Sequence, residues 1–162
     1  MSIIIGLDLS LCATGVVVIN EKGNILEKEL VESSSKEENT PRLTKICITI
    51  MKIVNSYKPN LVILEGPTFG VQKTISIFQL GELAGVVKEK LFIQNIPFII
   101  VPPSVLKKFI TGKGNAPKDI MMLKIYKKYG IEFENNNLAD AYALARYGIQ
   151  FLNPVLKKRT KI

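Results

Sequence analysis

The stretch SIIIGLDLSLCATGVVVIN, residues 2–20, decides the fold of this chain. It holds a near-continuous apolar run at 2–9 and a valine-rich run at 13–20, separated by a short segment of small residues. This spacing predicts two antiparallel strands joined by a tight connection. Turn-forming residues at 21–24 and a more polar run at 25–31 predict a third strand, suited to a sheet edge. We therefore expect the fold to begin with a three-stranded antiparallel meander.

The rest of the chain alternates between helical and strand patterns. Thr40 and Pro41 are of the types preferred at a helix N-cap and first helical position, and apolar residues then recur at helical spacing to about Tyr57. A buried strand is expected at 61–64 and a second apolar strand at 98–101. Four further helices are expected at 72–94, 104–110, 117–128 and 136–151. This order predicts an α/β fold of the mixed type. Its five-stranded sheet has three antiparallel strands followed by two parallel ones, with the first strand central and helices on both faces.

Length and composition fit one domain. The chain has 162 residues, of which 47% are hydrophobic and 22% charged, enough for a single buried core. We assign residues 1–152 to that domain and 153–162 to a basic, flexible tail. No segment approaches the roughly 20 apolar residues of a membrane span. Cys12 and Cys47 have no CxxC partner, which predicts free, buried thiols in a cytoplasmic protein.

The charge distribution points to a polyanionic partner. The net charge is +8, and residues 103–162 carry the whole excess, with twelve Lys/Arg against four Asp/Glu. Nucleic acid is the natural candidate, although a solvated basic surface would give the same count. Histidine is absent, which excludes Ser-His-Asp triads, Cys-His nucleophiles and His-ligated zinc. The chemistry must therefore use carboxylates, lysines or hydroxyls.

Acidic residues end two of the predicted strands. Asp8 and Glu65 each close a buried apolar run, and the carboxyl ends of neighbouring parallel strands meet at one edge of a sheet. Asp140 lies near the start of the last helix, which is able to fold back on that sheet. One such carboxylate is ordinarily a turn cap or an ion-pair partner. Three that converge favour a divalent cation site, because hard oxygen ligands suit Mg²⁺.

Four segments carry a family resemblance. They are GLDLSLCATG (6–15), VILEGPTFG (62–70), GKGNAPKD (112–119) and NLADAYALA (137–145). In this order and at these spacings they resemble RuvC-type Holliday junction resolvases of the RNase H-like superfamily. The compact size is closer to bacteriophage members. The resemblance implies an RNase H-like fold, a homodimer, branched DNA as substrate, and two Mg²⁺ ions, replaceable by Mn²⁺, that activate water for attack on a phosphodiester.

The same resemblance implies roles for individual residues. Asp8 would bridge the two ions, Glu65 and Asp140 would each hold one, and Lys118 would offset charge at the scissile phosphate. Phe69 matches approximately an aromatic that stacks on junction bases, although a loop phenylalanine packed on the core is an equal alternative. The candidates for phosphate contacts are Lys73, Lys107, Lys108 and Lys113.

Position 137 departs from the family pattern. Many RuvC-type enzymes have two aspartates three residues apart in the last helix, whereas this chain has Asn137 followed by Asp140. Asn137 offers a carbonyl oxygen to a metal but no charge, which would weaken one ion. Either three acids suffice, or Glu132 or Glu134 compensates, or catalysis is reduced.

These observations predict a Mg²⁺-dependent endodeoxyribonuclease that nicks branched DNA in recombination or phage DNA debranching, with no nucleotide cofactor. The alternative is a structure-specific DNA-binding protein with weak or no catalysis. An ATPase of the actin-like class shares the glycine-rich opening segment. It needs two large lobes, for which 162 residues are too few.

Overall fold

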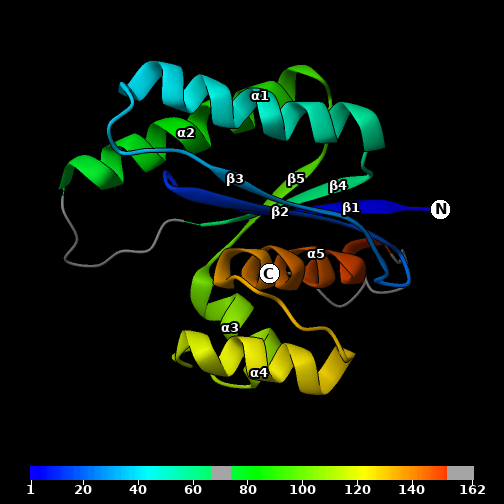
Figure 1. Ribbon diagram of the computed structural model, residues 1–162. Helices are drawn as coiled ribbons and strands as arrows, with labels where there is room; N and C mark the ends of the chain where they lie inside the picture. Colours follow the sequence, from blue (N-terminus) through cyan, green and yellow to red (C-terminus); the bar gives the residue numbers. More distant parts are fainter. Residues whose placement is uncertain (67–73, 153–162) are drawn as a thin grey trace.

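The computed structural model describes residues 1–66 and 74–152 (Figure 1). Its sheet has five strands, β1 (Ile3–Asp8), β2 (Ala13–Asn20), β3 (Ile25–Glu32), β4 (Leu61–Glu65) and β5 (Phe98–Val101). Their order is β3-β2-β1-β4-β5. The first three strands pair antiparallel, and β1–β4 and β4–β5 pair parallel. The predicted mixed sheet with a central first strand is confirmed.

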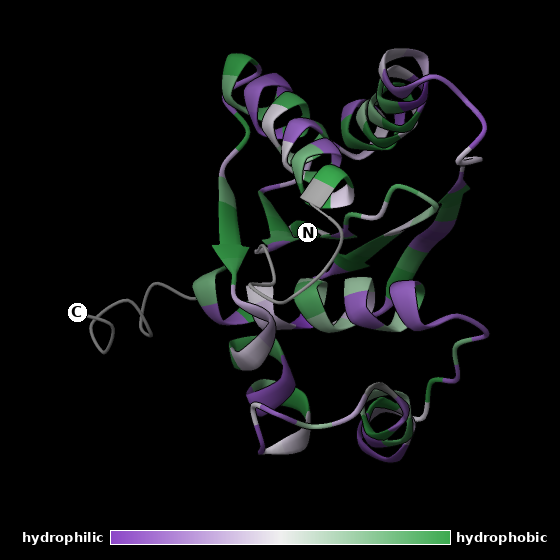
Figure 2. Cartoon of the chain, turned by 90° about the vertical axis from the view of Figure 1, so that its left-hand side faces the viewer, coloured by the Kyte–Doolittle hydropathy of each residue, from purple (hydrophilic) through white to green (hydrophobic). Residues whose placement is uncertain are grey.

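Helices cover both faces of the sheet. On one face lie α1 (Asn39–Tyr57) and α2 (Thr74–Ile93), and on the other lies α5 (Asn136–Leu152). We call these the α1 face and the α5 face. Figures 1 and 2 show α3 (Pro103–Thr111) and α4 (Lys118–Tyr129) forming a further layer beyond α5. No helix within residues 1–66 and 74–152 has the combined length and apolar character needed to cross a membrane.

Each strand of the sheet centre contributes to two separate cores. Alternate residues of β1 point to opposite faces, so Ile4 packs in the core under α5, while Ile5 and Leu7 pack in the core under α1 and α2. All three are fully buried. Burial on both faces explains why this segment of the sequence is almost continuously apolar rather than alternating.

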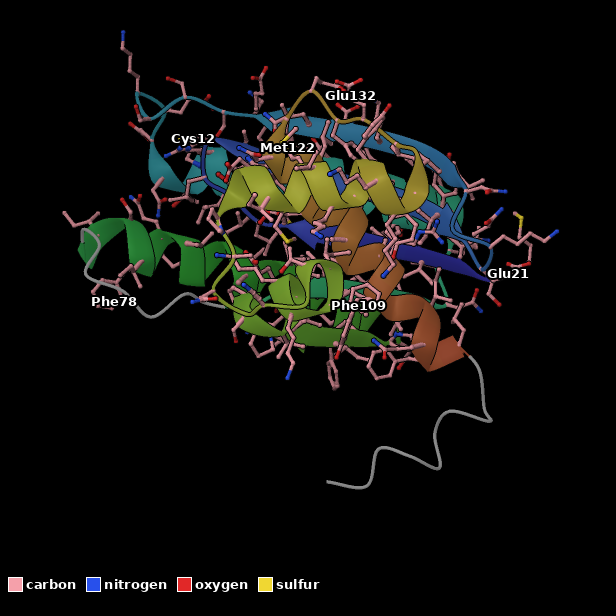
Figure 3. All side chains as sticks on the ribbon, turned by 90° about the horizontal axis from the view of Figure 1, so that it is seen from below. Cys12, Glu21, Phe78, Phe109, Met122 and Glu132 are labelled. Atoms are coloured by element: carbon pink, nitrogen blue, oxygen red, sulfur yellow. The ribbon has the colours of Figure 1, made fainter. Side chains whose placement is uncertain are left out.

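Three local expectations were wrong. The helix α1 begins two residues earlier than expected, because the Arg42 main-chain amide already donates to the Glu38 carbonyl at 3.1 Å, and Glu38 rather than Thr40 is the N-cap. Similarly, α3, expected from residue 104, begins at Pro103 with Pro102 as its N-cap residue. Cys12 is exposed, since it lies in the connection between β1 and β2, and only Cys47 is buried (Figure 3). The assignment of 153–162 to a tail lies outside the described residues.

Candidate active site at the carboxyl edge of the sheet

The strand register places Asp8 beside Glu65. Leu7 of β1 pairs with Leu64 of β4, so the next residues of these parallel strands, Asp8 and Glu65, lie at neighbouring strand ends. Alternation along each strand then decides the direction of the side chains. Ile4 and Ile63 belong to the core under α5, and Asp8 and Glu65 follow them by an even number of residues. Both carboxylates therefore lie on the α5 face, and Asp8 is only 7% exposed.

Two glycines allow the main chain of α5 to pack directly against the main chain of the strands at this edge. A Cβ at Gly6 would lie 2.7 Å from the Ala145 nitrogen and closer still to the Ala141 carbonyl oxygen. A Cβ at Gly15 would lie 3.1 Å from the Leu138 nitrogen and closer still to the main chain of Asn137. Because Gly15 is also the strand partner of Asp8, the first turn of α5 crosses directly beside Asp8.

The position of Asp140 is set by this crossing of α5 over the strands. It lies in the first two turns of α5, next to Ala141, and is partly exposed. The start of the helix is fixed by Asn135, whose side-chain oxygen accepts from the Asn137 amide at 2.7 Å and whose carbonyl accepts from the Ala139 amide at 3.1 Å. The fold thus brings the third predicted acid to the edge that holds Asp8.

The connection after Asp8 is held rigidly. The Ser10 amide donates to the Thr14 hydroxyl at 3.0 Å, and that hydroxyl, fully buried, donates to the Ser10 carbonyl at 2.7 Å. Arg42, which is only 5% exposed, donates to the Ser33 hydroxyl at 2.9 Å and to the Leu11 carbonyl. A buried guanidinium requires such acceptors, and here it braces the turn that immediately follows the acid.

The two glutamates near position 137, Glu132 and Glu134, are both exposed. Glu134 forms an ion pair with Lys28 of β3 at 2.9 Å, and the hydrogen bond from Lys28 holds the pKa of the Glu134 carboxyl below its usual value. Glu132 is exposed on the loop before α5 (Figure 3). At position 137 itself, the Asn137 side-chain amide donates to the carbonyl of Ala13.

The predicted lysines follow β5. Lys107 and Lys108 lie on α3, which begins where β5 ends, and Lys113 lies in the loop after it. That loop returns toward the start of α3, since a Cβ at Gly114 would lie 3.1 Å from the Ser104 carbonyl oxygen. Lys118 is the first residue of α4. Phe69 and Lys73 lie outside the described residues.

The acids share an edge but do not form a closed cluster. Among residues 1–66 and 74–152, no three His, Cys, Asp or Glu side chains converge tightly enough to hold a metal ion. The donor chemistry nevertheless fits a divalent cation, because carboxylates from β1, β4 and α5 offer hard, charged oxygens. A bound ion would have to draw these side chains together.

Sequence reasoning missed the residues that position the acids. Gly6 and Gly15 lie on the α5 face of neighbouring strands, one of them two residues before Asp8 and the other opposite Asp8, and these strand glycines were visible in the sequence. Arg42 carried no such signal, because one arginine in an amphipathic helix ordinarily lies on the solvent side.

Comparison with known proteins agrees with this architecture. Residues 4–147 match the family model described as crossover junction endodeoxyribonuclease RuvC. The RuvC of Brachyspira hyodysenteriae is 31% identical over 146 residues, covering 88% of this chain and 91% of that protein. The RuvC of Rickettsia conorii is 31% identical over 148 residues, covering 88% and 94%.

Solved structures show the same fold. Thermus thermophilus RuvC superposes with a TM-score of 0.79 at 22% identity, covering 93% of this chain and 95% of that one. The same protein in complex with Holliday junction substrate gives 0.77, again at 22% identity, covering 90% and 91%. With the family model spanning nearly all the described residues, this chain belongs to the RuvC family of crossover junction endodeoxyribonucleases.

Proposed function

We propose that this protein nicks four-way and related branched DNA, using divalent metal ions held by Asp8, Glu65 and Asp140. The observation that carries the proposal is the register of β1 and β4, which sets Asp8 and Glu65 side by side on the face that α5 covers. The RuvC family, whose nucleases depend on divalent metals, supplies the reaction class. Its bacterial relatives suggest that the protein works in the cytoplasm of a bacterial or phage-infected cell.

The proposed roles follow from where each residue lies. Asp8 ends the central strand, between Gly15 on one side and Glu65 on the other, and would help to hold both Mg²⁺ ions. Glu65 would bind one ion and Asp140 the other, with the side-chain oxygen of Asn137 as a neutral ligand. When bound, such a metal pair activates water and stabilises the attacking and leaving oxygens of the phosphodiester. Lys118 would offset developing charge on the phosphate.

The DNA would approach along α3 and the loop after it. Lys108 and Lys113 are exposed there, Lys107 is partly so, and all three are proposed to contact phosphates, together with Lys73. Phe69 is proposed to stack on bases at the branch point. Phosphate contacts of this kind would make binding weaken steeply as salt is raised.

The nuclease assignment is tested by nicking. A labelled four-way junction incubated with the protein and Mg²⁺ or Mn²⁺ should yield paired nicks, and Asp8→Asn should abolish them while leaving junction binding intact. Retained nicking by Asp8→Asn would remove that residue from the proposed site.

Two observations favour the alternative of junction binding with weak catalysis. The described acids do not form a closed metal site, and position 137 contributes no charge. Tight junction binding without nicks at any concentration of Mg²⁺ or Mn²⁺ would establish this alternative in place of the nuclease.

We further propose a homodimer formed through α2. Most residues of this helix are apolar, and Ile75, Phe78, Phe92 and Ile93 are between 62% and 76% exposed. Gly81 and Gly85 leave open space on its surface, where another helix can approach closely. Figure 3 shows Phe78 at the outer end of α2. A C₂ dimer would present two active sites to a nearly two-fold symmetric junction.

Light scattering tests the dimer. The protein should be dimeric at micromolar concentration, and Phe78→Glu should shift it to monomer. Ile48→Glu places the same charge on an exposed apolar position of α1, 50% exposed, and should leave the dimer intact. A monomeric native protein, or equal loss in both variants, would refute the assignment to α2.

A further inference from the structure

The side chain of Asn137 is tied to the start of β2. Its amide nitrogen donates a hydrogen bond to the main-chain carbonyl oxygen of Ala13, across 124 positions of sequence. A carbonyl oxygen can only accept, so position 137 must supply a donor. Asparagine does this, whereas an ionised aspartate offers only acceptors and would face the carbonyl with a like partial charge.

Two other restraints act at the same place. The side-chain oxygen of Asn135 accepts a hydrogen bond from the main-chain N–H of Asn137. The absence of a side chain at Gly15 lets the main chain of Asn137 lie against β2. Gly15 is the strand partner of Asp8. The three contacts together fix the first turn of α5 beside Asp8, and Asp140 follows three residues later on the same helical face.

We infer that Asn137 is a positioning residue, whose side-chain amide clamps the first turn of α5 to β2 and so sets where Asp140 meets Asp8. The inference deepens the proposed function, since it takes Asp140 as one of the acids of that site. The clamp orients the amide so that its nitrogen faces Ala13, and the oxygen is the atom left to face an ion. Compared with an aspartate, asparagine at position 137 therefore gives up a negative charge and gains a hydrogen bond that holds the start of α5 on β2.

Stability without metal tests the clamp directly. Asn137→Asp and Asn137→Ala are compared with Asn136→Asp, which adds the same charge in the same helical turn at an exposed position. Urea unfolding in EDTA should show an unfolding equilibrium constant raised roughly ten-fold in both position-137 variants, as expected for a lost partner of a partly buried carbonyl. Amide hydrogen exchange over residues 136–142 should accelerate in both. The Asn136→Asp control should match the native protein.

The effect of Mg²⁺ on the variants distinguishes a positioning role of Asn137 from a role as a metal ligand alone. If Asn137 only bound metal, Asn137→Asp in EDTA would match the Asn136→Asp control and would bind Mg²⁺ more tightly, and this result would overturn the inference. In the nicking assay, Asn137→Ala should lower the maximal rate even at saturating Mg²⁺, since positioning limits the step itself. Full recovery of the rate at high Mg²⁺ would also overturn it.

The two proposals fail separately. Unfolding and exchange in EDTA require neither metal nor DNA, so an inactive protein would still reveal the clamp. Conversely, an unperturbed Asn137→Ala variant that still nicks junctions would remove the clamp and leave the nuclease standing. If Asn137→Asp does not fold, Asn137→Ala, which adds no charge, supplies the comparison.

Discussion

Replacing Gly6 by alanine should push α5 slightly away from the sheet. An alanine is intrinsically better than glycine in a strand, so a loss of stability can come only from what its Cβ meets. At Gly6 the Cβ would lie 2.7 Å from the Ala145 nitrogen and nearer still to the Ala141 carbonyl oxygen. These are main-chain atoms of a packed helix, which cannot rotate aside as a side chain can. The helix must therefore move away by roughly 1 Å.

The magnitude follows from this displacement. Overpacking a core typically costs 1–3 kcal/mol, and a clash with main chain should reach the top of that range, about 3 kcal/mol. For a domain of this size that corresponds to a fall in Tm of roughly 6–12 °C. A shift of about 1 Å between Asp8 and Asp140 should lower the nicking rate by roughly 10²-fold.

Calorimetry and single-turnover nicking of a four-way junction measure both effects. Gly148→Ala is the matched control, because it adds the same methyl group to the same interface. Its Cβ would meet side-chain atoms of Ile4 and Ile63, each at 2.9 Å, and these can adjust. The control should lose less stability and keep most of its nicking rate. If Gly6→Ala is no worse than Gly148→Ala in either assay, α5 does not contact β1 through its main chain, and the reasoning is refuted.

Three further predictions concern residues around the edge. A thiol reagent should label only Cys12 in the native protein and both cysteines after unfolding, because burial shields Cys47 and raises the pKa of its thiol; two fast-reacting native thiols would contradict this. Glu134→Gln should leave nicking and its Mg²⁺ requirement unchanged. In the native protein, the ion pair with Lys28 should add a small stabilisation at neutral pH, and this stabilisation should disappear as pH falls through the lowered pKa of Glu134. Arg42→Met should cost about 1–3 kcal/mol in urea unfolding, because it strips donors from the carbonyl of the β1–β2 connection, and a neutral result would show that the brace is dispensable.

Much of the fold was predictable from the sequence because local pattern and topology agreed. The continuous apolar run before Asp8 indicated a central strand buried on both faces, and the similar run before Glu65 indicated its parallel neighbour. The register that sets the two acids side by side was implied by these runs ending together at one edge. The placement of Asp140 needed only a last helix that packs on the sheet.

The rest depends on contacts that no local pattern encodes. That Arg42 is buried follows from acceptors supplied by the β1–β2 connection and by Ser33. That Asn137 acts as a donor follows from the position of the Ala13 carbonyl. A residue type states which hydrogen bonds are possible, and only the folded arrangement selects among them. For the same reason, the sequence does not reveal that Glu134 pairs with Lys28.

The sheet also acts as a partition between two independent sets of constraints. The acids and the helix that completes their edge lie on the α5 face, whereas the exposed apolar surface of α2 lies in the layer on the α1 face. In the proposed dimer, sequence change in α2 would therefore alter how subunits pair without disturbing the spacing of the carboxylates. Likewise, position 137 can exchange one side chain for another without altering self-association. If both proposals hold, quaternary structure and metal chemistry could change at different rates in related proteins, because the two surfaces lie on opposite faces of the sheet.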